Sequence, residues 1–368
     1  MNKGNKLLRI IDNKSFELVK KIMESAPYNC SVNEEGNLYL IKYNQIRSDF
    51  SNKAVRQSRG IILEKETNKI VCWPFDKFFN YGEKYAAKID WTSARVQEKI
   101  DGSIIKVFYY NGWKVATNGT IDAYKAEITN GGKYKTFGDL FNEAEKGLNL
   151  FNKLDPEYTY IFELVSPWNR VVVPYKEIKI FHIGTRNNKI GQEVTTDIGV
   201  SKPKEYSFSS LEDVIAMTEH MSYDQEGYVV IDKNWNRVKV KSPAYLAVHK
   251  LSNNGVITRE RVIELIITNE TDEFLTYFPE YSEMINDMRK LFAAFKKQVM
   301  HDLVAIAESK PETRKEYAMK AKESVWPSFM FAVYDRKTLN FEEFISDFSP
   351  KKIEKLLYQF KKKIDKHN

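Results

Sequence analysis

The spacing of apolar residues changes once along the chain, near residue 243, and this change limits the folds that the chain can adopt. Before that point, short alternating or β-branched runs such as NLYLIKY, SIIKVFYY and YTYIFELVS are separated by hairpin-like turns. After it, segments such as TRERVIELIITN and SPKKIEKLLYQFKKKID repeat their apolar residues at helical spacing. The sequence therefore predicts an α+β protein, with an antiparallel-sheet domain over residues 1–243 and an all-helical domain over residues 244–368.

The composition is that of a globular protein made for a reducing compartment. The chain has 368 residues, of which 42% are hydrophobic and 29% charged. It has no run of 18 apolar residues, and its charged N-terminus lacks the apolar core of a secretion signal. Its two cysteines, Cys30 and Cys72, are far apart in sequence, so we expect neither a disulfide nor structural zinc. We expect a cytoplasmic or other reducing intracellular location, and no membrane partner.

Basic and aromatic residues in the helical half leave two interpretations open. From Lys351 onward the chain carries seven lysines against Glu354 and Asp365. A basic helix of this kind can neutralise phosphates, or it can simply be a solvated terminal helix. The aromatic residues of VWPSFMFAVYD can likewise stack on nucleic-acid bases or form the core of the helical domain.

Lys99 ends an expected strand in VQEKIDGSIIKV, directly before a turn at Asp101 and Gly102. A Lys-x-Asp-Gly sequence alone is weak evidence, because most lysines beside hairpin turns are merely solvated. A lysine that attacks the α-phosphate of a nucleotide needs specific neighbours. It needs carboxylates for a divalent metal ion and further cations for the departing pyrophosphate.

The residue types that this chemistry requires occur in order along the chain. Glu163 lies within an apolar strand, and Glu226 lies at the mouth of another. Lys239 and Lys241 alternate with valines, so both lysines point to one face of a strand. Two further cations open conspicuous segments upstream, Arg59 in RGIILE and Lys77 in KFFN. Each residue alone reads as an ordinary surface position, but together they predict a lysine nucleotidyltransferase site.

These motifs resemble those of the covalent lysine nucleotidyltransferase superfamily, which contains ATP-dependent polynucleotide ligases and mRNA-capping enzymes. The general motifs are KIDG at 99–102, FELVS at 162–166, IKIFHIG at 178–184, EGYVV at 226–230 and VKVKS at 238–242. More specific segments are similar to the family of bacteriophage T4 RNA ligase 1, namely RGIILE at 59–64, PFDKFFN at 74–80, the NRVV after FELVSPW, and RKEYAM at 314–319. The likeness runs from about residue 40 to the C-terminus.

The resemblance implies an ATP-dependent RNA ligase that joins 5′-phosphate and 3′-hydroxyl RNA ends. Lys99 would be the nucleophile that becomes lysyl-AMP, and the RNA 5′-end would then be adenylated. The implied cofactors are ATP and Mg²⁺, with Mn²⁺ as an alternative. The implied partners are single-stranded RNA ends or a nicked tRNA anticodon loop, and an end-healing kinase or phosphatase, in RNA or tRNA repair. The helical domain would recognise RNA or tRNA.

The resemblance also implies roles for individual residues. Lys239 and Lys241 would contact phosphate and act with Lys99 in catalysis, whereas Glu163 and Glu226 would bind the metal ion. The implied nucleotide-binding residues are Arg59, Lys77, Phe79, Glu98, Gly102, Asn118, Glu163, Lys239, Lys241 and Tyr245. Of these, Arg59 and Lys77 would grip the outer phosphates of ATP. Phe79 and Tyr245 would line the pocket, or would only pack in the core.

Asn118 is a departure from the family pattern, because the phage ligase has a lysine at this position. The asparagine can donate a hydrogen bond to a phosphate or sugar, but it brings no charge.

Two alternatives to an RNA ligase stay open. The chain can be a catalytically inactive RNA-binding relic of the same fold, or another lysine nucleotidyltransferase such as a capping enzyme or DNA ligase. Those enzymes continue into a β-rich domain after the lysine pair. The helical continuation here favours the RNA ligase branch.

Overall fold

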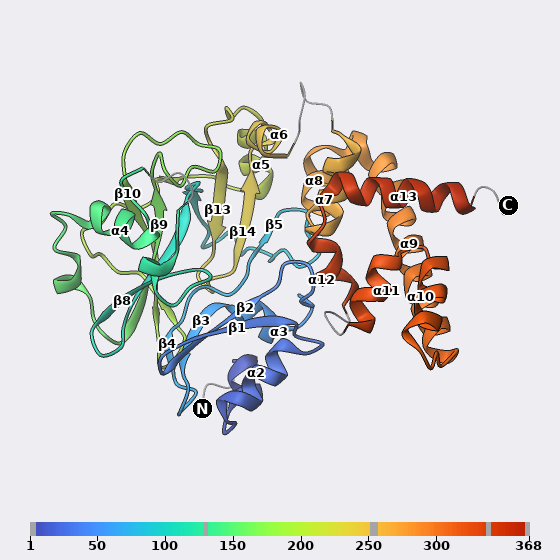
Figure 1. The fold of residues 1–368 in the computed structure, drawn as a ribbon. Coiled ribbons are helices and arrows are strands. Elements are labelled where there is room, and N and C mark those ends of the chain that lie inside the picture. The colour runs from blue at the N-terminus through green and yellow to red at the C-terminus, as the bar shows by residue number, and fades with distance from the viewer. Residues whose placement is uncertain (1–4, 129–131, 251–256, 336–339, 365–368) are drawn as a thin grey trace. The chain divides into compact units, whose positions relative to one another are not determined.

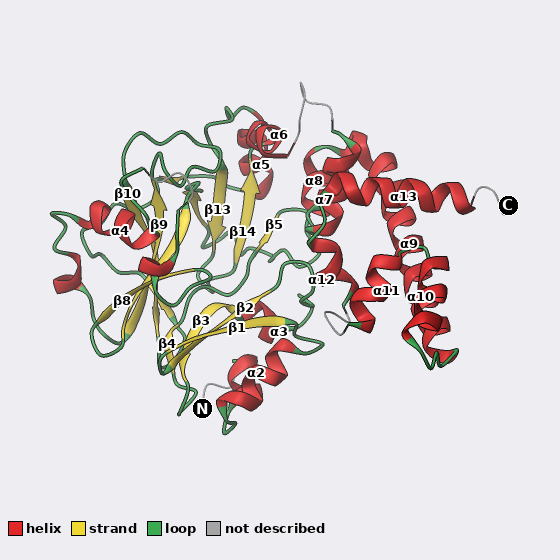
Figure 2. Ribbon diagram, in the orientation of Figure 1, coloured by secondary structure: helices red, strands yellow, loops and turns green. Residues whose placement is uncertain are grey.

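The computed structural model describes residues 5–128, 132–250, 257–335 and 340–364 (Figure 1). The chain forms two compact units, Met1–His249 and Lys250–Asn368. The first contains antiparallel sheets with a few helices, and the described part of the second is helical (Figure 2), so the predicted α+β class is confirmed. Within the described residues, no helix has both the length and the apolar character needed to cross a membrane.

The division between the units falls after His249, not after residue 243 as the sequence indicated. The difference is helix α6 (Pro243–Lys250), which begins where the strand pattern ends but belongs mostly to the first unit. Its Tyr245 is 2% exposed, and the Tyr245 hydroxyl donates a hydrogen bond of 2.9 Å to Asp101 Oδ1. The helical spacing of apolar residues therefore begins at Pro243, within the first unit, because α6 belongs mostly to that unit.

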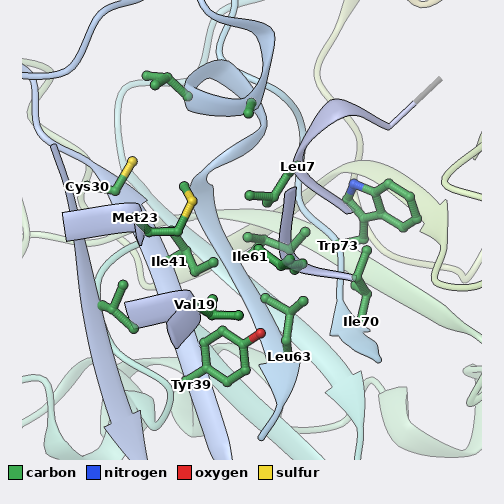
Figure 3. Packing of buried hydrophobic residues seen from close by; sticks show 14 of the residues in the cluster. Leu7, Val19, Met23, Cys30, Tyr39, Ile41, Ile61, Leu63, Ile70 and Trp73 are labelled. Atoms are coloured by element: carbon green, nitrogen blue, oxygen red, sulfur yellow. The ribbon is translucent and has the colours of Figure 1, made fainter. Parts of the chain in front are cut away.

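An N-terminal sheet has the antiparallel order β1-β2-β3-β4. Its strands are β1 (Cys30–Glu35), β2 (Leu38–Tyr43), β3 (Arg59–Glu64) and β4 (Ile70–Cys72). Three short helices accompany it, α1 (Lys6–Ile11), α2 (Phe16–Glu24) and α3 (Lys53–Gln57). Asn5, Ser15 and Asn52 cap these helices through their side chains. The helices bury one face of the sheet in an apolar cluster that includes Leu7, Val19, Met23, Tyr39, Ile41 and Ile61 (Figure 3).

The second sheet has the order β11-β10-β9-β7-β8 and carries the central motifs. Its strands are β7 (Ser103–Tyr109), β8 (Trp113–Thr117), β9 (Tyr158–Val165), β10 (Lys179–Asn187) and β11 (Glu193–Val194). Helix α4 (Phe137–Glu145), which begins with a capping box at Thr136, buries Leu140 and Phe141 against it. Short 3₁₀ turns lie at η1 (Ala123–Lys125) and η2 (Leu150–Lys153). Leu40 and Ile62 of the first sheet share a cluster with Phe108 and Ala116 of this one.

The third sheet has the order β12-β6-β13-β14-β5. Its strands are β5 (Phe79–Asn80), β6 (Arg95–Glu98), β12 (Glu205–Tyr206), β13 (Gly227–Ile231) and β14 (Arg237–Lys241), and only the β14–β5 pair is parallel. Alternation along β14 buries Val238 and Val240 in a cluster that also contains Val214 of helix α5 (Leu211–Glu219). Lys239 and Lys241 therefore point away from that cluster, as the sequence predicted.

The helical unit contains α7 (Arg259–Ile267), α8 (Thr271–Tyr277), η3 (Pro279–Tyr281), α9 (Ser282–Glu308), α10 (Arg314–Glu323), α11 (Pro327–Tyr334), α12 (Phe341–Ser346) and α13 (Pro350–Ile364). Trp326 and Phe329 are at most 1% exposed in its core, whereas Tyr334 is 41% exposed. The core interpretation therefore holds for the first two aromatic residues. The basic helix α13 is amphipathic, and its Leu357 and Phe360 are buried in the same core.

Candidate active site

Lys99 follows β6 and faces Glu226, which directly precedes β13. The Lys99 Nζ and Glu226 Oε2 atoms are 2.6 Å apart, and the Glu226 side chain is only 5% exposed. The backbone fixes both ends of this pair. The Lys99 amide donates to Gly227 O at 2.8 Å, and the Ser242 amide donates to Glu226 O at 2.8 Å. Lys241 Nζ is 4.0 Å from Glu226 Oε1, so two cations share this carboxylate.

Lys99 opens onto a cavity of about 180 Å³ between the second and third sheets. Ile104 and Ile183 line it from the second sheet, and Val229 lines it from the third. The sequence-predicted residues that line the same cavity are Arg59, Glu98, Lys99, Glu163, Glu226, Lys239 and Lys241. The fold thus brings together seven positions that span most of the first unit.

Glu163 lies on β9, on the other side of the cavity from β14. The pKa of Glu163 is raised to about 7, mainly by burial and also by the nearby Glu226. Lys99, Arg59 and a hydrogen bond from the Gly102 amide oppose this rise. A β-carbon added at Gly102 would lie 2.4 Å from Leu164 O, so only glycine allows the turn after Lys99 to pass this close to β9.

Two of the three carboxylates that line the cavity, Glu163 and Glu226, suit a metal ion that is shared with a substrate. Among the described residues, no group of three or more His, Cys, Asp or Glu side chains is arranged to hold a metal ion. Magnesium, however, is commonly bound by one or two carboxylates together with substrate phosphates and water. Glu163 and Glu226 fit this type of site, with the remaining ligands supplied by a nucleotide.

Arg59 begins β3 and extends into the same cavity. Its guanidinium lies 4.9 Å from the ring centre of Phe78. Arg59 Nη1 is buried and has no hydrogen-bond partner among the described residues. A buried donor without a partner is costly, and an anionic ligand would satisfy it.

Lys77 and Phe79 line a second cavity of about 450 Å³, which shares Phe78 and Arg237 with the first. Lys77 Nζ is 4.5 Å from the ring centre of Phe50 and 5.2 Å from that of Phe79. The structure therefore places Lys77 and Phe79 in a cavity that adjoins the Lys99 cavity.

Asn118 and Tyr245 are not among the residues that line either cavity. Asn118 lies against Gly60, where an added β-carbon would be 2.4 Å from Asn118 O and 3.1 Å from its Oδ1. Tyr245 instead supports the turn after Lys99 through its bond to Asp101. Gly102 also lines neither cavity. Nucleotide binding by Gly102, Asn118 and Tyr245 stays a prediction, as do the roles of the residues that line the cavities.

Arg237 was missed by the sequence analysis, although its position is informative. It lies two residues before Lys239, so the same alternation puts it on the cavity face of β14. Its guanidinium forms a buried ion pair with Glu193 of β11, at 2.9 and 2.5 Å, and lies 4.2 Å from the ring centre of Phe75. This pair joins the third sheet to the second beside the cavity.

Lys106 is a second residue that the sequence did not single out. It is fully buried on β7, and its Nζ donates a hydrogen bond to the Gly60 carbonyl. The pKa of Lys106 is lowered to about 8, mainly by burial; Cys72 opposes this fall, and the nearby Lys42 and Arg59 add to it. Its amine thus supports the backbone directly after Arg59.

This buried amine predicts a change of stability with pH. Between pH 8 and 10.5 the folded protein releases the Lys106 proton while the unfolded chain still holds it, so the free energy of unfolding should rise with pH. The expected gain is about 3 kcal/mol over this range. Urea unfolding of the wild type and Lys106→Met between pH 7 and 10.5 measures it as the difference between the two pH profiles. Parallel profiles would contradict the prediction.

A lysine at the end of a strand, three carboxylates and several cations around one cavity are the arrangement that the sequence predicted for a nucleotidyltransferase site. The chain matches the RNA ligase family model over residues 57–245, just over half of its length, and it belongs to that family. The prediction of an RNA ligase is therefore confirmed.

Similar proteins in the sequence comparison are also described as RNA ligases. The chain is 27% identical over 402 aligned positions to an RNA ligase of Rhodothermus phage RM378, covering 88% of this chain and 91% of that protein. It is 31% identical over 284 positions to a protein of Autographa californica nuclear polyhedrosis virus described as a bifunctional polynucleotide kinase/RNA ligase. That match covers 70% of this chain but only 40% of the viral protein. A solved archaeal ATP-dependent RNA ligase is 12% identical, with a TM-score of 0.45, over 74% of this chain and 78% of that one.

Proposed function

We propose that this chain seals RNA by a three-step reaction that uses ATP and passes through an adenylated Lys99. The observation that carries the proposal is the position of Lys99. Its amine is 2.6 Å from a buried carboxylate, at the edge of a cavity lined by Arg59, Lys239 and Lys241. A cavity with one strand-held amine and this concentration of cations suits attack on a nucleotide phosphate.

In the first step, the Lys99 amine gives up a proton, with Glu226 as the nearest acceptor, and attacks the α-phosphorus of ATP. A phosphoramidate bond forms and the bond to pyrophosphate breaks. Lys239, Lys241 and Arg59 stabilise the negative charge on the phosphates, and Arg59 Nη1 gains the acceptor that it lacks. Magnesium held by Glu163 and Glu226 would neutralise phosphate charge when bound.

The second and third steps transfer the AMP and release it. A 5′-phosphate oxygen of RNA attacks the phosphorus of lysyl-AMP, the phosphorus–nitrogen bond breaks, and the amine takes back a proton. A 3′-hydroxyl then attacks the adenylated 5′-phosphate, a phosphodiester forms, and AMP leaves. Lys239 and Lys241 can serve all three steps, because each step develops negative charge near one phosphorus. RNA or tRNA repair, with a kinase or phosphatase that prepares the ends, is the setting that we propose.

The test uses the purified full chain with Mg²⁺ and ATP labelled in its α-phosphate, after bound AMP has been discharged with pyrophosphate. We expect acid-labile label on the protein from ATP and not from labelled GTP. Adding 5′-phosphate RNA should move the label to the RNA and produce sealed strands. If neither Mg²⁺ nor Mn²⁺ supports labelling, the chain is an inactive RNA-binding relic and the proposal fails.

A further inference from the structure

The loop 166–175, which follows β9, exposes apolar and basic side chains close to the Lys99 turn. Trp168 is 40% exposed and Val171 is 48% exposed, and Arg170 between them is also exposed. Large apolar side chains on a surface usually mark a contact with another molecule when they form a group. None of these three residues lines the two cavities beside Lys99.

Side-chain hydrogen bonds hold the first part of this loop in one conformation. Ser166 Oγ donates to Asn169 Oδ1 at 2.6 Å. Asn169 Nδ2 donates to Ser103 Oγ at 3.0 Å and to Leu164 O at 2.8 Å. The exposed tryptophan therefore lies on a segment that is tied to β7 and β9, and its position costs little further entropy when a ligand binds.

The second part of the loop is tied to the turn that carries Lys99. The amides of Val172 and Val173 both donate to Asp101 Oδ2, at 2.9 and 2.8 Å. Asp101 is 4% exposed and lies two residues after Lys99. The loop and the reactive lysine are thus parts of one hydrogen-bonded assembly.

The exposed side chains have the chemistry that single-stranded RNA requires. An indole offers a face on which a base can stack, and a guanidinium can bind one phosphate. Arg170, two residues after Trp168, donates from its Nε to Val172 O at 2.9 Å, which ties its guanidinium to the loop backbone. Gly132 lies close to the indole: a β-carbon added to this glycine would be 3.2 Å from Trp168 Cη2. The exposed Lys133 follows Gly132 in the chain.

We propose that this loop binds the terminal nucleotides of the RNA strand that carries the 3′-hydroxyl. A base of that strand stacks on Trp168, and a neighbouring phosphodiester contacts Arg170. The inference rests on the proposed sealing reaction. In that reaction the strand with the 3′-hydroxyl is the acceptor, and this loop is the surface that binds it.

Charge decides between the two RNA ends. A 5′-phosphate end brings a terminal dianion, which needs several cations, and the cavities beside Lys99 supply them as Arg56, Arg59, Lys77, Lys239 and Lys241. The loop offers Arg170, and the exposed Lys133 follows Gly132, which lies close to the Trp168 indole. This smaller charge matches an acceptor end, which carries only diester phosphates and a neutral hydroxyl.

The test isolates the last step by supplying RNA that is already adenylated at its 5′-end, together with a separate 3′-hydroxyl acceptor. We expect Trp168→Ala to raise the KM for the acceptor roughly ten-fold. Trp168→Phe, which keeps an aromatic face, should stay within about three-fold of the wild type. Tyr109→Ala is the matched control, since Tyr109 is 43% exposed at the far end of β7 and outside the proposed surface.

A second measurement detects stacking directly. An acceptor with 2-aminopurine as its last base should lose fluorescence when it binds the wild type, and Trp168→Ala should abolish this quenching. Self-adenylation needs no RNA and reports whether the Lys99 site is intact in each variant.

Three outcomes would overturn the inference. One is an unchanged acceptor KM in Trp168→Ala, and another is a change confined to the KM of the adenylated donor. The third is a loss of self-adenylation as large as the loss of sealing, because the loop would then act only through Asp101. If the wild type seals RNA while any of these holds, only this inference fails. If the wild type forms no lysyl-AMP and seals no pre-adenylated RNA, the proposed function fails with it.

Discussion

Lys99→Ala is expected to lower covalent labelling by α-labelled ATP by roughly 10³-fold or more, because the variant lacks the amine that we propose as the nucleophile. The same variant should still seal RNA that is adenylated beforehand, since the last step uses Lys99 only as a neighbour. We expect that rate to stay within about ten-fold of the wild type. Labelled ATP and pre-adenylated RNA, tested on one preparation, measure the two steps separately.

Lys99→Arg separates the chemistry of the amine from its ion pair. Arginine retains a positive charge for Glu226, whose side chain is 5% exposed and would otherwise keep only Lys241, at 4.0 Å, as a cationic partner. A guanidinium stays protonated at neutral pH and is no nucleophile, so this variant should fold like the wild type and remain unlabelled. Lys114→Ala, at an exposed position on β8, is the control: it removes a lysine outside the cavity and should leave labelling unchanged. Label on Lys99→Arg would place the nucleophile elsewhere.

Much of the site was predictable from sequence because it depends on strand alternation and on short motifs. Lys239 and Lys241 follow from a period of two, and the structure does place both on the cavity face of β14. Arg237 obeys the same period and was equally readable. Its partner Glu193 was not predictable, because it lies in the two-residue strand β11, which is too short to show a pattern.

Other features depend on contacts between distant segments, which no local pattern reports. Lys106 looks like one of many strand lysines, and only packing of the first sheet on the second makes it a fully buried donor to Gly60. Helix α6 has helical spacing, which suggests the helical unit. The hydrogen bond from Tyr245 to Asp101, across 144 residues, instead ties this helix to the first unit. The sequence therefore located the change of secondary structure at residue 243, while packing set the unit boundary after His249.

Asp101→Ala is expected to cause the largest loss of stability among substitutions near the site. The Asp101 carboxylate accepts hydrogen bonds from the amides of Val172 and Val173 and from the Tyr245 hydroxyl, at 2.8 to 2.9 Å. Alanine would remove the acceptor that the buried Val172 amide, the partly buried Val173 amide and the Tyr245 hydroxyl share, which costs about 1 to 3 kcal/mol for each donor that water cannot reach. We expect the free energy of unfolding to fall by about 3 to 5 kcal/mol, as measured by urea unfolding of the full chain.

A graded series keeps this prediction testable if Asp101→Ala fails to fold. Tyr245→Phe removes one of the three bonds and should cost about 1 kcal/mol. Asp101→Asn should fall between the two, because its amide oxygen can still accept from the Val172 and Val173 amides while the Tyr245 hydroxyl turns to accept from its amino group. Self-adenylation should decline in the same order, since Asp101 holds the turn that aims Lys99 at the cavity. If Tyr245→Phe and Asp101→Asn both unfold like the wild type, Asp101 is not the structural centre of this turn, and the link between the loop 166–175 and Lys99 loses its physical basis.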